Sequence, residues 1–359
     1  MKFIHLANVF LGTGPLENSR FTIDRTTEYY ADFLKVLDVC KEEKIDALFI
    51  TGNLFDHVPA EEELQDLDDR FMELPDTRVF LLTGEKDAPE SAETAKKYSW
   101  RSNTTVFAGD CIERVYVSKL NTEITGIGYS EKTWERVKTE SLTRGRKGTV
   151  QVLLLPFMGS GRTAELPEYE GGLPFDYIGI GQERFFKGRG REKIYSPGLF
   201  EPEGFSQQLT HGYFTGELNP ELRGTPGLSI RFEQGAKREY MTLKVNAAEE
   251  ISYVEAEQRI RSAIDKYGKD NVYRILLTGK ASASLCLMRD KLYELGLVAE
   301  IQDEMDREDA MEHMKGSATG DALSRFLGAP IDEEDAKIRK KALEYGVNAL
   351  FAVQDERNK

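Results

Sequence analysis

The chain has 359 residues, of which 40% are hydrophobic and 31% are charged, and its formal net charge is −14 at pH 7. This composition excludes a disordered chain, and no apolar run approaches the roughly 20 residues that a membrane-spanning helix needs. Nucleic-acid binding draws most of its affinity from Lys and Arg, so a chain this acidic can bind DNA only where basic residues are concentrated. The length exceeds what one hydrophobic core usually supports, and we expect two domains with a smaller third segment.

The first part of the chain alternates strand and helix patterns. Apolar runs predict strands at Lys2–Ala7, Ile45–Ile50 and Val79–Leu82. Apolar residues at helical spacing predict helices between them, over Tyr30–Cys40 and Leu64–Leu74. This βαβαβ order predicts an α/β fold with a parallel sheet covered by helices, whose chemistry lies in the loops after the strands.

Closely spaced strand patterns follow the alternating region. They cover Thr104–Ala108, Cys111–Val117 and Glu123–Ile127, and their short connections predict antiparallel pairing on a second sheet. Two further buried strands are predicted at Val150–Leu155 and Asp176–Ile180. We therefore expect a two-sheet domain over residues 1–222.

A segment with two prolines and two glycines, Asn219–Gly227, predicts a domain boundary. Beyond it we expect a compact α/β domain over residues 223–305, with strands at 229–232, 240–245, 272–278 and 298–302 and helices at 254–267 and 285–295. Residues 306–359 predict a helical C-terminal segment. Its apolar positions, among them Leu343 and Val347, favour docking on the body of the protein, with a partner helix as the alternative.

Cysteine usage and basic residues bear on location and partners. Cys40, Cys111 and Cys286 form no C-x-x-C pair, which is typical of a reducing compartment, and the sequence predicts a cytoplasmic protein. Basic residues gather most densely from Arg184 to Lys193, beside two phenylalanines and two glycines. A solvated hairpin tip is the favoured interpretation, and a platform for phosphate or bases is the alternative.

Four loops stand at the ends of predicted strands: His5–Gly12, Thr51–Asp56, Thr83–Asp87 and Gly181–Phe185. In order and spacing they resemble the metal-ligand motifs of the calcineurin-like metallophosphoesterases, and most closely those of the SbcD-type DNA repair exonuclease subunits. The segment Tyr195–Leu199 and the run that begins at His211 resemble two further family segments. The resemblance implies a two-sheet metallophosphoesterase sandwich with a smaller α/β capping domain, two Mn or Mg ions and an SbcC-like coiled-coil ATPase or a related nuclease chain as partner.

The resemblance also assigns the ligand positions, and none keeps the family's residue. The family's catalytic histidine falls on Lys86. The metal ligands fall on Asn8, Phe10, Asn53, Glu85, Pro156, Gln182 and Arg184.

Two divalent ions about 3.5–4 Å apart repel each other, and anionic ligands between them make the pair stable. Asn53 stands where the bridging carboxylate is expected but carries no charge, and Phe10 and Pro156 have no side-chain donor atom. We therefore expect no bound metal and no catalytic residue. The sequence predicts a noncatalytic homologue, a pseudoenzyme retained as a binding or regulatory scaffold.

Two alternatives come from the same loops. The first is an active metal-dependent exonuclease or phosphoesterase with a rebuilt oxygen site for Mg or Ca, made by Asp56, Glu85, Asp87 and Glu183. The second is a metal-free module that binds phosphate or nucleic acid through positive side chains: Lys86, Arg184, Lys187, Arg189 and Arg191.

Overall fold

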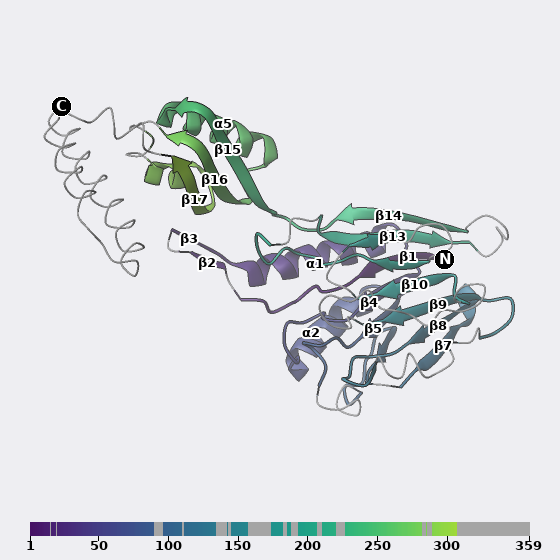
Figure 1. Cartoon of the computed structure of the whole chain (residues 1–359). Coiled ribbons are helices and arrows are strands. Elements are labelled where there is room, and N and C mark those ends of the chain that lie inside the picture. Colours follow the sequence, from purple (N-terminus) through teal and green to yellow (C-terminus); the bar gives the residue numbers. More distant parts are fainter. Residues whose placement is uncertain are drawn as a thin grey trace, which may run out of the picture. The chain divides into compact units, whose positions relative to one another are not determined.

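The computed structural model describes residues 1–306, apart from positions 15, 19, 90–95, 110, 134–141, 143–144, 157–173, 182–184, 188–192, 207–209, 220–226, 282–284 and 286–288. The chain divides into two compact units (Figure 1). The first holds Met1–Glu203 and Leu209–Lys237, and the second holds Gly204–Gln208 and the chain from Arg238 onward. The helical segment expected over residues 306–359 lies almost wholly outside the described residues.

A six-stranded sheet of the first unit carries the predicted alternating start. Its strand order is β14-β13-β1-β4-β5-β6. β1 (Lys2–Leu6), β4 (Ala47–Thr51), β5 (Arg78–Leu82) and β6 (Thr104–Phe107) run parallel, while β13 (Gly212–Leu218) and β14 (Leu228–Gln234) are antiparallel. The predicted β-α-β-α start of a mixed α/β fold is confirmed. The expectation that Thr104–Ala108 belongs to the second sheet is wrong, because β6 pairs in parallel with β5.

The second six-stranded sheet has the order β11-β12-β10-β9-β8-β7. Its strands are β7 (Glu113–Val117), β8 (Thr122–Gly126), β9 (Val150–Leu155), β10 (Tyr177–Ile180), β11 (Phe186–Lys187) and β12 (Ile194–Ser196). The predicted antiparallel pairing is confirmed for β7 and β8, and the central strands are parallel. Both buried strands expected between residues 150 and 180 belong to this sheet.

Apolar side chains hold these layers together. One buried cluster joins the inner faces of the two sheets and includes Phe49, Phe80, Leu154 and Tyr177. A second lies between the other face of the first sheet and two helices, α1 (Arg25–Glu42) and α2 (Glu61–Met72). The first unit is therefore a sandwich of two sheets with helices over one outer face (Figure 1). Shorter elements are the hairpin β2 (Leu16–Asn18) and β3 (Phe21–Ile23) and the 3-10 turn η1 (Ser118–Leu120).

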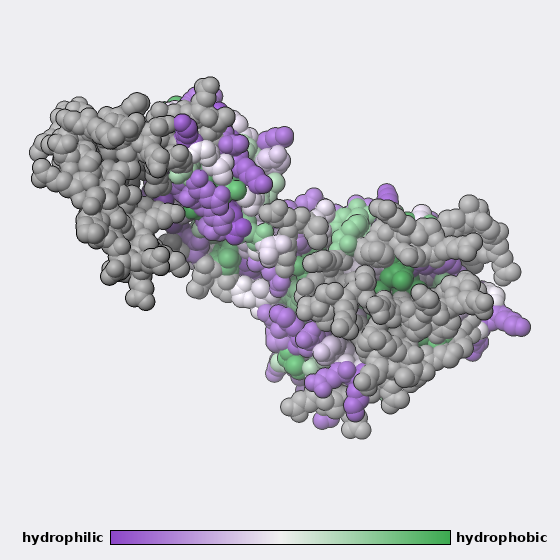
Figure 2. All heavy atoms as spheres, in the orientation of Figure 1, coloured by the Kyte–Doolittle hydropathy of each residue, from purple (hydrophilic) through white to green (hydrophobic). Residues whose placement is uncertain are grey.

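The second unit has a parallel three-stranded sheet of β15 (Tyr240–Ile251), β16 (Val272–Ala281) and β17 (Val298–Asp306). Helix α5 (Tyr253–Tyr267) starts at a capping box in which Ser252 and Glu255 exchange hydrogen bonds, and it buries Ile260 and Ile264. A 3-10 segment, η2 (Arg289–Leu295), covers only part of the helix predicted at 285–295. Hydrophilic side chains make up much of the visible described surface of this unit (Figure 2).

The division between the units differs from the boundary expected after residue 222. Strand β14 was expected in the second domain, but its seven residues pair with β13 and extend the first sheet. The chain changes unit between Lys237 and Arg238. A segment rich in proline and glycine can connect two strands of one sheet as well as two domains, and this ambiguity explains the difference.

Within the described part of the chain, no helix is long and apolar enough to cross a membrane.

Candidate functional site

Three of the four loops meet at one edge of the first sheet. β1, β4 and β5 are parallel neighbours, so the loops that follow them emerge side by side. Backbone hydrogen bonds join the first two loops: Asn8 N–H donates to Gly52 O at 3.1 Å, and Phe10 N–H donates to Asn53 O at 3.1 Å. The junction of the three loops, called the cleft below, contains Asn8, Phe10, Asn53 and Glu85, four of the positions to which the resemblance assigned metal ligands.

The backbone at three of these positions is unusual for the residues present. Asn8, Phe10 and Asn53 have φ angles of 51°, 55° and 51°, in the left-handed region. Asparagine tolerates this conformation, but a bulky residue such as phenylalanine rarely adopts it. Strained backbone of this kind clusters at functional sites, where the surrounding structure imposes it. The loops therefore keep a shape that the side chain of Phe10 does not favour.

The two asparagine side chains bond to each other. Asn53 Nδ2 donates to Asn8 Oδ1 at 2.8 Å. Asn53 Oδ1 accepts the backbone N–H of Lys86 at 3.0 Å, and Asn8 Nδ2 donates to Gly198 O at 3.3 Å. Both amide oxygens thus accept an N–H donor from the protein, which engages one of the two lone pairs of each oxygen.

The third loop packs tightly against Asn53 because residue 84 is glycine. A Cβ atom on Gly84 would lie 2.3 Å from both the backbone nitrogen and Oδ1 of Asn53. Pro156, which follows β9 on the second sheet, closes the same corner, since a Cβ on Gly52 would lie 3.6 Å from the Cβ of Pro156. The structure therefore brings together Asn8, Asn53 and Pro156, three of the positions that the resemblance assigned to metal ligands.

Phe10 forms a small apolar cluster beside the asparagine pair. Its ring is buried with Tyr29 of α1 and Leu199. On another side, Lys86 Nζ lies 5.2 Å from the centroid of the ring, within range of a cation–π contact. Lys86 itself is exposed. An apolar ring and an ammonium group therefore lie at two positions to which the resemblance assigned histidines.

Asp87, the residue of the third loop that agrees with the resemblance, is turned inward. One carboxylate oxygen accepts the N–H of Gly84 at 2.5 Å, and the other accepts those of Leu54 and Phe55 at 2.7 and 3.3 Å. Burial raises the pKa of Asp87 to about 6, although these N–H donors act in the opposite direction. The carboxylate therefore ties the second loop to the third.

Asp56 and Glu85, two further residues of the rebuilt-site alternative, are also described by the structure. Asp56 accepts from His57 at 2.6 Å, and Glu85 is exposed. Over the described residues, no group of three or more His, Cys, Asp or Glu side chains could hold a metal ion. Gln182, Glu183, Arg184, Arg189 and Arg191 lie outside the described residues, and only the backbone of Lys187 is described, in β11.

Sequence reasoning missed the role of His5. It is fully buried in β1, with Nδ1 2.6 Å from Tyr177 Oη and Nε2 2.8 Å from Thr51 Oγ1. Burial lowers its pKa to about 3, so the imidazole is neutral and links the two sheets beneath the loops. The signal in the sequence was its place inside an apolar strand, where a polar side chain needs a partner.

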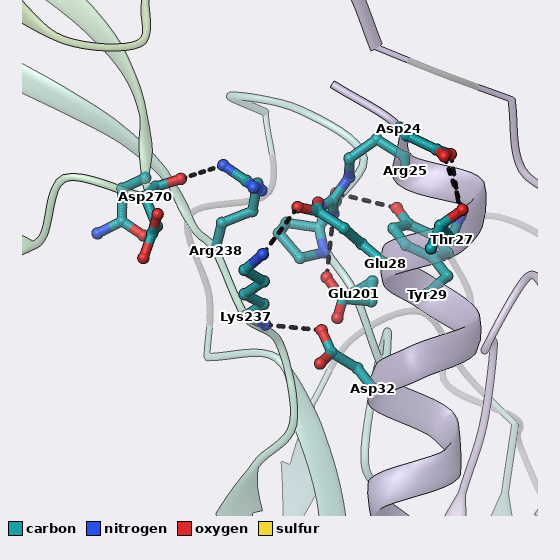
Figure 3. A network of polar contacts seen from close by, with 12 residues as sticks. Asp24, Arg25, Thr27, Glu28, Tyr29, Asp32, Glu201, Lys237, Arg238 and Asp270 are labelled. Carbon is teal, nitrogen blue, oxygen red and sulfur yellow. Dashed lines mark hydrogen bonds and ion pairs between the residues drawn. The ribbon is translucent and has the colours of Figure 1, made fainter. Parts of the chain in front are cut away.

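A polar network supports the Leu199 side of the cleft (Figure 3). Arg25 at the start of α1 pairs with Glu28 at 2.9 Å and with the buried Glu201 at 3.0 Å, and its guanidinium lies over the ring of Tyr29. The Tyr29 hydroxyl donates to Pro202 O at 3.2 Å. These contacts fix residues 198–202, which supply the Gly198 carbonyl to Asn8.

His57 gives a first prediction, for pH-dependent stability. Its two ring nitrogens contact Asp56 and Glu63, and these hydrogen bonds raise its pKa. In the unfolded chain His57 titrates near 6.5, the ordinary value, and in the folded protein at a higher pH. The stabilisation by its protonated ring is therefore complete below about pH 6.5 and is lost as the pH rises through the folded pKa. Because the side chain is 43% exposed, we expect His57→Ala to cost less than about 1 kcal/mol. Melting curves at pH 5.5 and pH 9 should show a larger loss at the lower pH; an equal loss at both would contradict the assignment.

Comparison of the sequence with models of known protein families found no matching family, and a search of curated proteins found no matching relative.

Proposed function

We propose that this chain is a noncatalytic member of the calcineurin-like metallophosphoesterases, related to the SbcD-type exonuclease subunits, and that it works as a binding or regulatory scaffold. The observation that carries the proposal is the left-handed backbone of Asn8, Phe10 and Asn53. These loops keep a strained shape at the positions matching the family's ligands, while the side chains there have changed. A partner such as an SbcC-like coiled-coil ATPase or a related nuclease chain belongs to the same proposal.

The chemistry of the cleft does not fit a pair of divalent ions. Phe10 and Pro156 offer no side-chain donor atom. The oxygens of Asn8 and Asn53 accept protein N–H groups, and the Lys86 ammonium adds positive charge beside the Phe10 ring. Loss of a single supporting hydrogen bond to a ligand typically weakens metal binding by about 10- to 100-fold. Replacement of the ligands themselves should weaken metal binding even more. Without metals, hydrolysis by the family's route has no activated water.

The test is a metal titration combined with a nuclease assay. We expect calorimetry with millimolar Mn to give no heat of binding, and Mn with a DNA duplex to give no cleavage. Asn53→Ala serves as the control, because it removes the central amide of the cleft. Metal-dependent cleavage that Asn53→Ala abolishes would refute the proposal in favour of a rebuilt active site. Heat of binding lost in Asp87→Asn would point to the same alternative.

A further inference from the structure

An apolar cavity is lined by residues of the second and third loops, among them Leu54, next to Asn53, and the buried Asp87. Its volume is about 90 Å³, and its walls include Leu54, Phe55, Val58, Leu64 and Trp100. Engineered cavities of about 150 Å³ with similar walls bind benzene. The smaller volume here suits a single aliphatic side chain, such as leucine, better than a fused aromatic ring.

The cavity is partly open to the solvent. Val58, one of its walls, is 52% exposed, so this wall faces the solvent. Thr83 also borders the cavity, and its buried hydroxyl oxygen has no hydrogen-bond partner among the residues described. This oxygen is shielded from the solvent, so an aliphatic occupant of the cavity breaks no hydrogen bond there.

The rim of the cavity on the α2 side is acidic. Pro59 and Leu64 both line the cavity, and the chain between them carries Glu61, Glu62 and Glu63. Glu61 and Glu62 are exposed, whereas Glu63 contacts His57. Arg101, which follows the wall residue Trp100, does not offset this charge, because it pairs with Asp68 and Asp69.

We propose that this cavity and the first turn of α2 form a docking site for a basic segment of a partner protein that inserts one aliphatic side chain. A buried apolar anchor surrounded by complementary charge is the usual design of such interfaces. This docking site rests on the proposed scaffold function, and its partner class is a basic protein segment with an aliphatic anchor. It needs no metal, so cleavage activity would refute the scaffold function without affecting this site.

The probe is a short synthetic peptide of lysine, glycine and serine with one central leucine. Trp100 lines the cavity and reports binding by its fluorescence in a Trp134→Phe background, since the sequence holds only these two tryptophans. We expect a saturable change at low salt. It should be lost when the leucine is replaced by alanine, and when the lysines are replaced by glutamates.

Variants of the protein separate this site from general charge attraction. Glu61→Gln combined with Glu62→Gln should weaken binding on the order of threefold to tenfold, while Glu42→Gln combined with Glu43→Gln, on the exposed end of α1, should not. The proposal would be overturned if the leucine peptide does not bind, or if the alanine peptide binds as tightly as the leucine peptide. It would also be overturned if the two double variants of the protein bind the leucine peptide equally well. Trp100 fluorescence that changes with protein concentration alone would assign the cavity to a second copy of the chain, and would also overturn it.

Discussion

Phe10→Ala is expected to lower the free energy of unfolding by about 3–5 kcal/mol. The substitution removes a buried ring from its contacts with Tyr29 and Leu199, and the polar network around Arg25 limits how far the walls can collapse. Alanine also keeps the cost of a left-handed backbone at φ 55°. Phe10→Gly loses the same ring but relieves that cost. We therefore expect the glycine variant to be more stable than the alanine variant by about 1 kcal/mol.

Phe33 provides a matched control for this pair. It is fully buried on α1, where glycine is less favourable than alanine by about 1 kcal/mol. Urea unfolding of the four variants should therefore rank glycine above alanine at residue 10 and below alanine at residue 33. The same ranking at both residues would mean that the loop relaxes around the smaller side chains and that the fold does not impose a left-handed backbone on residue 10.

The sequence predicted the position of the cleft better than its contacts. Parallel strands in consecutive βα units place their following loops at one edge, so chain order alone brought Asn8, Asn53 and the Gly84 loop together. Whether these side chains form hydrogen bonds with one another depends on their rotamers and on the distances between them, and local sequence patterns predict neither. Asp87 illustrates the limit: its carboxylate looked available as a metal ligand, yet it accepts three backbone N–H groups inside the fold.

Strand partners were the less predictable part of the fold. Local patterns located β6 and β14 within a few residues, but both were expected beside the wrong neighbours. An alternating strand can pair with any edge that matches its apolar face, and the choice depends on contacts distant in the sequence. The Tyr195–Leu199 segment was recognised through the resemblance alone. Its role emerged only from the bond between Gly198 and Asn8.

Glu201→Gln is expected to flatten the pH dependence of stability. Burial, and then the neighbouring Asp32 carboxylate, raise the pKa of Glu201 to about 8, while Arg25 acts in the opposite direction. In the unfolded chain the group loses its proton near 4.5, the ordinary value, so between about pH 4.5 and 8 the folded state holds a proton that the unfolded state has released. Stability from this group is complete below that window and is lost as the pH rises through it, at up to about 1.4 kcal/mol per pH unit. Glutamine imitates the protonated acid at every pH.

The parent protein should therefore lose stability between pH 5 and 8 more steeply than Glu201→Gln, as measured by urea unfolding across that range. Asp87 also lowers stability as the pH rises, because its pKa increases from the ordinary 3.8 to about 6 in the folded protein. This contribution is the same in the parent protein and in Glu201→Gln. Glu203→Gln is the matched control, because Glu203 lies on the same segment and is exposed. If both substitutions leave the slope unaltered, Glu201 is ionised in the folded protein. The Arg25 pair would then be a buried salt bridge, and removal of the Glu201 charge would cost about 3–5 kcal/mol at neutral pH by leaving a buried guanidinium without its full set of partners.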